Sequence, residues 1–411
     1  MSEISLEYLQ GLDATDPLAH FRDLFALPED LIYLDGNSLG ALPKQTPAHL
    51  QNVINKQWGQ ELIRSWNSHQ WLQKPVQLGD RLGKFVGAAQ GQNLVCDSTS
   101  VNIFKLAAAA IRLRPRRHKI ITETGNFATD LYLLQGLQRM LGDQLELVAV
   151  SRDKVAAEID KETALVLLTH THYKSGQIWD MAEITALSHQ HGALILWDLS
   201  HSLGAMPVYL DQLNVDFAVG CNYKYINGGP GAPAYLYVAQ RHQDKLEQPL
   251  TGWLGHRRPF DFDDHYQPAL GIEQTLCGTP SVLANAALET ALDIMEQADL
   301  SALRHKSQQL GNIFIQLVTK FCPEFEIASP TDPNQRGSQV SITHPEGYAI
   351  MQNLIARNII GDFRAPNNMR FGFAPLYIRY TDIWHTVETL ADIMATGSWQ
   401  ETRFHQRQTV T

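Results

Sequence analysis

The sequence predicts an α/β fold in which a mostly parallel sheet is flanked by helices on both faces. The middle of the chain alternates short apolar runs with amphipathic stretches of helical period. Some runs, such as Thr163–Thr169, are almost continuous in apolar residues, which is typical of strands buried on both faces of a sheet. Hydrophobic residues make up 44% of the 411 residues and charged residues 18%, which argues against a disordered, collagen-like or coiled-coil chain.

The repeating unit of this middle region is a strand followed by a helix. The expected strands are His118–Glu123, Glu146–Val150, Thr163–Thr169, Ala193–Leu199, Val215–Cys221 and Ala234–Val238. Helices are expected between them at Asp130–Leu141 and Met181–His191. The second helix is followed by Gly192, a residue type that favours a helix C-terminus.

The C-terminal third has another layout, typical of an α+β domain. Its expected elements are helix Leu300–Phe321, strand Gln339–Thr343, helix Gly347–Ala356, a strand around Met369–Phe373 and a last helix from Thr381. We therefore expect an N-terminal arm (1–48) that packs with the small domain, a large domain (49–285) and a small C-terminal domain (286–411).

The charge balance and the chain ends restrict the function classes. There are 33 basic and 43 acidic residues, a net charge of −10, which argues against nucleic acid or an anionic membrane as the main partner. No run approaches the roughly 18 apolar residues of a membrane span, and no secretory signal pattern is present, so we expect a cytoplasmic protein. The four cysteines are far apart and are expected to be free thiols: Cys96, Cys221, Cys277 and Cys322.

Three short patterns suggest other chemistry. Gly36–Gly40 matches the G-x-S-x-G nucleophile elbow, but it comes before every sheet strand. Gly229–Ala234 fits G-x-G-x-x-A, but it leads into a strand, whereas a dinucleotide site needs a helix there. His170 and His172, with Asp198 nearby, leave a metal-dependent hydrolase as an alternative, although a third ligand at a characteristic spacing is missing.

The strongest candidate site combines an acid and a lysine. Asp198 ends one buried strand, and Lys224 follows the next strand, directly before a glycine-rich loop (227–231). Ligands bind at the carboxyl ends of such strands. A lysine that forms a Schiff base and an acid that keeps a pyridine nitrogen protonated are what pyridoxal phosphate requires. The alternative is a salt bridge at the sheet edge.

Two further segments favour the pyridoxal phosphate interpretation. Hydroxyl residues, among them Thr99 and Ser100, directly precede a helix over 101–111, and a helix N-terminus with free N–H groups binds phosphate. A simple helix cap is the alternative there. Phe127 follows another strand, where its ring could lie against a flat cofactor.

These residues resemble the kynureninase family, which belongs to the aminotransferase class V group of pyridoxal phosphate enzymes. The segments that carry the resemblance are Leu34–Gly40, Trp197–His201, Asn222–Gly231, Gly252–His256 and Met369–Pro375. They span most of the chain. The resemblance implies an aspartate aminotransferase-like fold of type I, with a seven-stranded sheet in the large domain. It also implies a homodimer whose active site lies at the subunit interface.

The resemblance implies roles for individual residues. The catalytic positions are Lys224, Tyr223 and Asp198. The cofactor-binding positions are Thr99, Ser100, Phe127, Ala128, Thr129, Asp130, Thr169, Asp198, His201, Tyr223, Lys224, Trp253 and Thr279, of which Trp253 and Thr279 would act from the neighbouring subunit. The substrate-binding positions are Asn37, Ser38, Trp66, Gly278 and Arg370.

Arg370 matches the arginine that binds the substrate carboxylate, a role that suits a guanidinium because it can donate two parallel hydrogen bonds. Arg364 and Arg379 are rivals close in sequence. Gln60 stands where some family members carry a histidine that contacts the substrate ring, so the choice between kynurenine and 3-hydroxykynurenine stays open. The implied reaction is hydrolysis of L-kynurenine to anthranilate and L-alanine, in tryptophan catabolism and on the route towards NAD synthesis. The alternatives within the group are an aminotransferase and a cysteine desulfurase.

Overall fold

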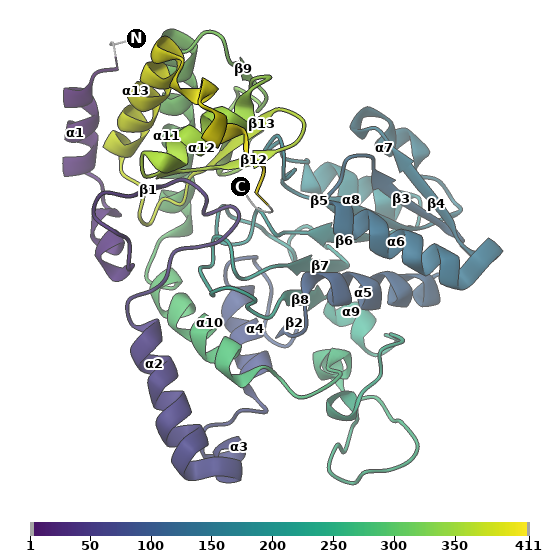
Figure 1. Cartoon of the computed structure of the whole chain (residues 1–411). Helices are drawn as coiled ribbons and strands as arrows, with labels where there is room; N and C mark the ends of the chain where they lie inside the picture. Colours follow the sequence, from purple (N-terminus) through teal and green to yellow (C-terminus); the bar gives the residue numbers. More distant parts are fainter. Residues whose placement is uncertain (1–3, 409–411) are drawn as a thin grey trace.

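A seven-stranded sheet forms the centre of the larger lobe in the computed structural model, which describes residues 4–408 (Figure 1). Its strands, in spatial order, are β2 (Asn93–Val95), β8 (Tyr235–Val238), β7 (Phe217–Gly220), β6 (Leu194–Asp198), β5 (Thr163–Thr169), β3 (Lys119–Glu123) and β4 (Glu146–Val150). Strand β8 is antiparallel to β2 and β7, and the other neighbours are parallel. The predicted α/β fold is confirmed.

Helices cover both faces of this sheet because its strands are apolar on both sides. On β5, Leu165 and Leu167 pack with one buried cluster, while Val166 and Leu168 pack with another. The first face is covered by α5 (Thr99–Leu113) and α6 (Ala128–Leu141), and the second by α4 (Lys74–Gly83), α7 (Arg152–Glu158) and α8 (Met181–Gln190). Both faces of β5 are therefore buried against helices, which explains why its sequence is an almost continuous apolar run.

The predicted strands of the large sheet lie within two residues of the observed ones, and those at 146–150 and 163–169 have the expected bounds. Strand β2 was not predicted. Its three residues are too short for a recognisable pattern, and it pairs only with β8. In the C-terminal third, the helices at 300–321 and 347–356 and the strand at 339–343 have the predicted bounds.

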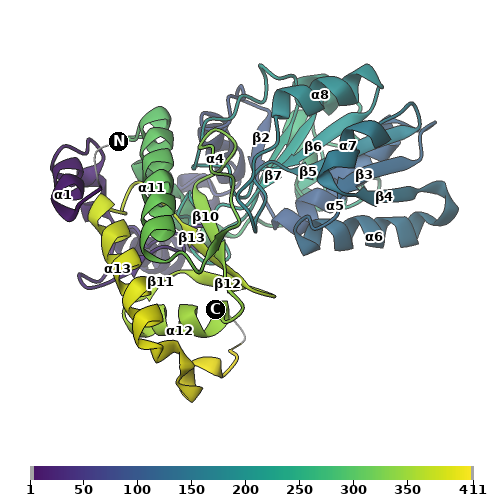
Figure 2. The same cartoon turned by 90° about the horizontal axis from the view of Figure 1, so that it is seen from above.

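The smaller lobe contains a four-stranded antiparallel sheet and three helices, which lie beside the large sheet when seen from above (Figure 2). The strands, in spatial order, are β12 (Asp362–Arg364), β13 (Asn368–Gly372), β10 (Gln339–Thr343) and β9 (Glu326–Ile327). The helices are α11 (Leu300–Phe321), α12 (Gly347–Ala356) and α13 (Tyr380–Thr396).

The N-terminal arm lies against the smaller lobe. Helix α1 (Leu6–Ala14) packs on α13. The first backbone N–H groups of α13 donate hydrogen bonds to the Asp13 carboxylate, and the one from Tyr380 N is 2.6 Å long. Strand β1 (Ile32–Tyr33) pairs in parallel with β11 (Ile359–Ile360). From the end of the arm the chain crosses to the large lobe as α2 (Thr46–Asn52), the π-helical segment η2 (Val53–Glu61) and α3 (Ser65–Ser68).

Helix α10 (Val282–Met295) packs on α2 and α4 (Figure 1). The expected domain boundary between residues 285 and 286 lies inside this helix.

Between α9 (Gln240–Gln243) and α10, a long segment extends from the lobe and contains the short helices η5 (Trp253–Gly255) and η6 (Gly271–Thr275). The remaining short helices are η1 (Ala19–Leu24), η3 (Leu62–Arg64), η4 (Gly142–Gln144), η7 (Ser398–Gln400) and η8 (Thr402–His405). Within residues 4–408, no helix combines the length and the apolar character needed to cross a membrane.

Candidate active site

A cavity of about 160 Å³ lies at the carboxyl ends of β5 and β6. Thr169 and Asp198 end these two parallel strands and are partners in register. The cavity is lined by Ser98, Thr99, Ser100, Phe127, Thr129, Asp130, Thr169, Tyr173, Asp198, Ser200, His201, Tyr223 and Lys224. Parallel topology therefore brings together nearly all the predicted cofactor residues of one chain, as expected for a site at strand ends.

Asp198 is a buried carboxylate on the cavity wall. It accepts a hydrogen bond from the backbone N–H of Ser200 at 2.7 Å. Burial raises the pKa of Asp198, although the Ser200 hydrogen bonds and the charge of Lys224 act against the rise. A buried carboxyl group of this kind is stabilised by a cation, and none of the hydrogen bonds it makes to the protein supplies one.

Lys224 contacts His201, with 2.8 Å between Nζ and Nε2. The other ring nitrogen, Nδ1, lies 3.2 Å from Oε1 of Gln339, whose amide NH₂ donates to the Tyr173 carbonyl at 2.9 Å. This network assigns the proton to Nδ1 and leaves Nε2 as the acceptor for the lysine. Burial, together with the charges of Lys224 and Arg370, lowers the pKa of His201, so the imidazole is neutral.

A second carboxyl group, that of Asp130, also lines the cavity. The Thr169 hydroxyl contacts Oδ1 of Asn126 at 2.5 Å and Oδ2 of Asp130 at 3.2 Å. Burial and the charge of Asp198 both raise the pKa of Asp130. This polar network fixes the first turn of α6, which carries Ala128, Thr129 and Asp130. Ala128 is not among the residues that line the cavity.

The remaining walls supply an aromatic face and a helix N-terminus. The Phe127 ring is 42% exposed, its centroid is 5.9 Å from Lys224 Nζ, and Tyr173 contacts it edge-on at 5.3 Å. Thr99 and Ser100 form the first turn of α5, whose N-cap Ser98 accepts from Val101 N at 3.3 Å. Helix α5 has 15 residues, so its N-terminus offers free N–H groups and a positive dipole to an anion.

Arg370 reaches the site from the smaller lobe. Its Nη1 donates to the carbonyl of Tyr173 at 2.5 Å, and its Nη2 donates to the Ser38 hydroxyl at 3.2 Å. Asn37 donates to Gln339 Oε1 at 3.4 Å. The arm segment Gly36–Gly40, which matches the nucleophile-elbow pattern, therefore runs between the two lobes and does not open a helix of the sheet.

The rival arginines have other partners. Arg379 lies at the N-terminus of α13 and donates to Asp382 at 2.8 Å. Arg364 forms an ion pair with Asp362 at 2.8 Å, beside Arg370. Among these three arginines, Arg370 is the one that donates a hydrogen bond to a residue lining the Lys224 cavity, Tyr173.

Besides Ala128, Asn37, Ser38 and Arg370, four further predicted residues do not line this cavity. Thr279 and Gly278 line a separate cavity of about 260 Å³, and Trp253 is exposed on η5. Trp66 packs edge-on against Trp71, with ring centroids 5.4 Å apart. Within one described chain, residues 4–408, these side chains are not brought to Lys224.

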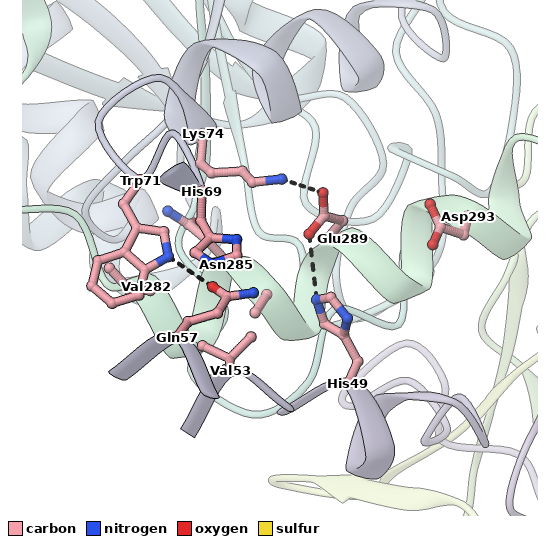
Figure 3. Close-up of a pocket in the computed structure, with 11 residues that line it drawn as sticks. His49, Val53, Gln57, His69, Trp71, Lys74, Val282, Asn285, Glu289 and Asp293 are labelled. Atoms are coloured by element: carbon pink, nitrogen blue, oxygen red, sulfur yellow. Dashed lines mark hydrogen bonds and ion pairs between the residues drawn. The ribbon is translucent and has the colours of Figure 1, made fainter. Parts of the chain in front are cut away.

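A larger cavity of about 390 Å³ lies between α10 and the α2–η2 segment (Figure 3). Glu289 of α10 faces both Lys74 and His49, and Gln57 accepts a hydrogen bond from the Trp71 ring at 3.0 Å. Lys74 is held in an ion pair with Glu289, and neither Lys224 nor Asp198 lines this cavity. It therefore does not have the features of the Lys224 cavity.

The metal alternative is not supported by the geometry. The His170 ring contacts the Ser202 hydroxyl at 2.9 Å, while His172 Nε2 contacts the Gly125 carbonyl at 3.0 Å. No group of three His, Cys, Asp or Glu side chains in the described part of the chain is arranged to hold a metal ion. The desulfurase alternative required Cys322, which is buried at the end of α11 and whose pKa burial raises to about 12.

The sequence interpretation missed Tyr173, Gln339 and Asp362. Tyr173 follows the strand end at Thr169 by four residues, a position that could have been recognised. Gln339 and Asp362 lie on the small antiparallel sheet, and only its placement against the large lobe brings them to the site.

The residues that line the Lys224 cavity fit pyridoxal phosphate. The buried Asp198 carboxylate suits a protonated pyridine nitrogen, Phe127 offers a face to a flat ring, the first turn of α5 suits the phosphate, and Lys224 suits the aldehyde. Fold and site together define a pyridoxal-phosphate-dependent enzyme.

Comparisons with known proteins identify the family. A family model for the DegT/DnrJ/EryC1/StrS aminotransferases matches residues 53–209, and one for the kynureninase C-terminal domain matches residues 303–390. A kynureninase of Pseudomonas fluorescens is 48% identical over 409 residues, and one of Burkholderia pseudomallei (strain 1106a) is 47% identical over 408 residues, each covering 98% of both chains. This chain belongs to the kynureninase family.

Solved structures with low sequence identity share the fold. A mutant of C-DES with glycine covalently linked to its PLP cofactor has a TM-score of 0.76 at 18% identity, over 95% of this chain and 100% of that chain. The cysteine desulfurase CsdA from Escherichia coli also has a TM-score of 0.76, at 17% identity, over 92% of this chain and 98% of that chain. At this identity the likeness concerns the fold alone.

Proposed function

We propose that this chain is a kynureninase, which hydrolyses the Cβ–Cγ bond of L-kynurenine to give anthranilate and L-alanine, and also converts 3-hydroxykynurenine to 3-hydroxyanthranilate. The observation that carries the proposal is a cavity lined by Lys224 and Asp198, with Arg370 bonded to Tyr173 of its wall, in a chain 48% identical to a kynureninase. A lysine and a buried acid suit the cofactor, and the arginine suits the carboxylate of an amino acid.

When bound, pyridoxal phosphate supplies an electron-withdrawing ring that stabilises negative charge developing on the carbon atoms of the bound amino acid. Asp198 would keep the pyridine nitrogen protonated. The negative charge of its buried carboxylate and the positive charge of the nitrogen would neutralise each other. Phe127 and the hydroxyls of Thr99 and Ser100 orient the ring and the phosphate.

Lys224 anchors the cofactor and then moves the proton of the substrate Cα. The neutral His201 supports this role, because its Nε2 accepts a hydrogen bond from Nζ and holds the amine in the cavity. Tyr223 precedes Lys224 and lines the same cavity, so its phenol is placed to exchange a proton with the substrate. Arg370, supported by Ser38, binds the substrate carboxylate, while Asn37 holds Gln339 beside His201.

The functional unit of the proposal is a homodimer. Apolar side chains of the η2–η3 region and of the long segment before α10 are exposed in the chain: Ile54, Trp58, Leu62, Ile63, Phe260, Phe262 and Leu270. Exposed apolar groups in such number favour association. Trp253, Thr279, Gly278 and Trp66 would then complete the neighbouring subunit's site, and the enzyme would act in the cytoplasm, in tryptophan catabolism and towards NAD synthesis.

A mixing experiment tests the shared site. Lys224→Ala and Trp253→Ala are each expected to lower activity as homodimers. Hybrids formed by mixing and refolding the two variants contain one site without either change, so part of the activity should return. If mixtures are no more active than the separate variants, Trp253 does not act across an interface.

The reaction itself is tested with purified holoenzyme and L-kynurenine. We expect anthranilate fluorescence and L-alanine in equal amounts, with no keto-acid acceptor, and a yellow protein because of the lysine-bound cofactor. A yellow protein that forms no anthranilate, but converts an amino acid only when a keto acid is added, would be an aminotransferase and would overturn the proposal.

A further inference from the structure

Arg370 is held by a carboxylate of its own chain. Asp362 on β12 lies opposite Arg370 on β13 in the antiparallel register, and their exposed fractions are 0% and 2%. Arg370 Nε donates to Asp362 Oδ1 at 2.7 Å, and Nη2 donates to Oδ2. One edge of the guanidinium is therefore fixed, and its orientation toward Tyr173 and the cavity follows from this bidentate pair.

Asp362 also organises its neighbours. The Ser38 hydroxyl donates to Asp362 Oδ2 at 2.7 Å, and Arg364 reaches the same oxygen at 2.8 Å. Burial alone would raise the pKa of Asp362, but the hydrogen bond and charge of Arg370 and the charge of Arg364 outweigh it and lower the pKa. Asp362 therefore stays ionised at neutral pH and neutralises one of the two guanidinium groups.

Asp35 is the second carboxyl group of this cluster. It follows β1 in the N-terminal arm, and its Oδ1 is buried with no hydrogen-bond partner among the described residues. Burial and the charge of Asp362 raise the pKa of Asp35 to about 7, although Ser38, Arg370 and Arg364 act against the rise. A proton on Asp35 therefore leaves as the pH rises through the neutral range.

No other group of the cluster changes its charge in that range. The titratable or charged groups that act on Asp35 or respond to it are Tyr33, Tyr225, Asp362, Arg364, Arg370 and Tyr377. Burial raises the pKa of each of the three tyrosines, and the arginines remain charged. With Asp35 protonated, two guanidinium groups and one carboxylate leave one net positive charge, and ionised Asp35 cancels it.

We propose that Asp362 is the positioning residue for Arg370, and that the proton on Asp35 sets the net charge with which this arginine binds the substrate carboxylate. The proposal rests on the proposed function, in which Arg370 receives that carboxylate. It adds two residues to those that determine carboxylate binding: Asp35 from the arm and Asp362 from the small sheet. Carboxylate affinity is then greatest when Asp35 is protonated.

The test uses a ligand that does not titrate in the working range. 4-Oxo-4-phenylbutanoate carries the carboxylate and the ketone of kynurenine without the α-amine, and 4-oxo-4-phenylbutanamide is its uncharged match. Binding of each to the holoenzyme is measured by calorimetry. The Kd of the acid should rise by about fivefold or more between about pH 6 and about pH 9, while the Kd of the amide stays constant.

Two variants separate the parts of the proposal. Asp35→Asn should hold the acid near its low-pH affinity at every pH. Asp362→Asn should raise the Kd of the acid and leave the Kd of the amide unchanged. If Asp362 acted only through its negative charge, its removal would make the acid bind more tightly. Asp392→Asn, at an exposed position of α13, is the matched control and should keep the wild-type pH profile.

The outcomes are decisive. A wild-type Kd for the acid that does not change with pH, or a pH dependence that Asp35→Asn retains, overturns the role of Asp35. Tighter binding of the acid to Asp362→Asn overturns the positioning role. If the enzyme forms anthranilate but shows either result, only this inference fails, whereas a protein that forms no anthranilate fails the proposed function.

Discussion

The two sides of the site are assembled in different ways. The cofactor side (Thr99, Ser100, Phe127, Asp198 and Lys224) comes from strand ends of one mostly parallel sheet and from the segments that follow them. The carboxylate side (Asp35, Ser38, Asp362 and Arg370) joins the N-terminal arm to an antiparallel sheet more than 300 residues later in the chain. Parallel topology brings the residues at the strand ends to one edge of the sheet. The carboxylate side depends instead on how the two lobes and the arm pack together.

The electrostatics of the two sides also differ. On the cofactor side the buried carboxyl groups Asp198 and Asp130 have raised pKa values, and no arginine within residues 4–408 pairs with them, so they suit a cationic ring. On the carboxylate side Asp362 is already paired with two arginines. The first side is prepared for a cation and the second for an anion, which is the charge pattern of a protonated cofactor ring and an amino acid carboxylate.

The largest expected effect is the loss of the amine on the cofactor side. Lys224→Ala should lower kcat by about 10³-fold or more, because it removes both the anchor and the proton-transfer group. The yellow absorbance should be lost as well. Lys161→Ala, an exposed lysine, is the control and should keep both. A Lys224→Ala enzyme with normal turnover would show that another lysine carries the chemistry.

Removal of the guanidinium tests the carboxylate side. Arg370→Ala should raise KM by roughly 10- to 100-fold with a smaller effect on kcat, because charge-assisted hydrogen bonds to the substrate are lost. It should also lower Tm, since Asp362 is left buried without this partner. Arg379→Ala, whose side chain bonds Asp382, serves as the control. An unchanged KM would assign the carboxylate to Arg364.

The contact between the two sides is tested at Gly40. Its N–H donates to the Tyr223 carbonyl at 2.7 Å, and a Cβ there would lie 2.3 Å from the Lys224 carbonyl oxygen. Gly40→Ala should therefore lower the free energy of unfolding by about 1–3 kcal/mol. Gly11→Ala, on the exposed face of α1 with no atom near its Cβ, should be slightly stabilising. Equal stability of both variants would show that the arm does not press on the Lys224 segment.

The smallest expected effect is a pH dependence of stability from the buried imidazole of His170. Burial lowers the pKa of His170 from 6.5 to about 4, so the unfolded chain binds its proton first as the pH falls. The native state should lose about 1 kcal/mol between about pH 6 and about pH 5 for this reason. In denaturant titrations His170→Asn should remove that increment, whereas the exposed His118→Asn should retain it. An unchanged profile in His170→Asn would contradict the assignment.

Much of the cofactor side could be predicted from the sequence. Asp198 ends one recognisable apolar strand and Lys224 follows another, and the hydroxyls at 99 and 100 lie in the first turn of a helix with an alanine-rich middle. Local rules of period and capping were sufficient there, because strand ends of a parallel sheet meet at one edge whatever the rest of the chain does. Tyr173 was missed although it lies just beyond such an end.

The carboxylate side was less accessible to the same reasoning. The family resemblance implied a role for Arg370, but no period or spacing indicates that Asp362 faces it, because cross-strand pairing depends on register. The same holds for Asp35 and Gln339, because the charged partners of Asp35 lie more than 300 residues away in the chain and His201 lies 138 residues from Gln339. Burial changes the pKa and the hydrogen bonding of such side chains only once those neighbours have packed around them.

The sequence by itself determined the α/β fold, the positions of most strands, and the acid–lysine pair, because these follow from local apolar patterns and chain order. The tertiary structure alone decided which partners the charged groups receive: His201 for Lys224, Asp362 for Arg370, and a shared cluster for Asp35. The physical reason is that electrostatic interactions depend on distance and burial, and both are set by long-range packing.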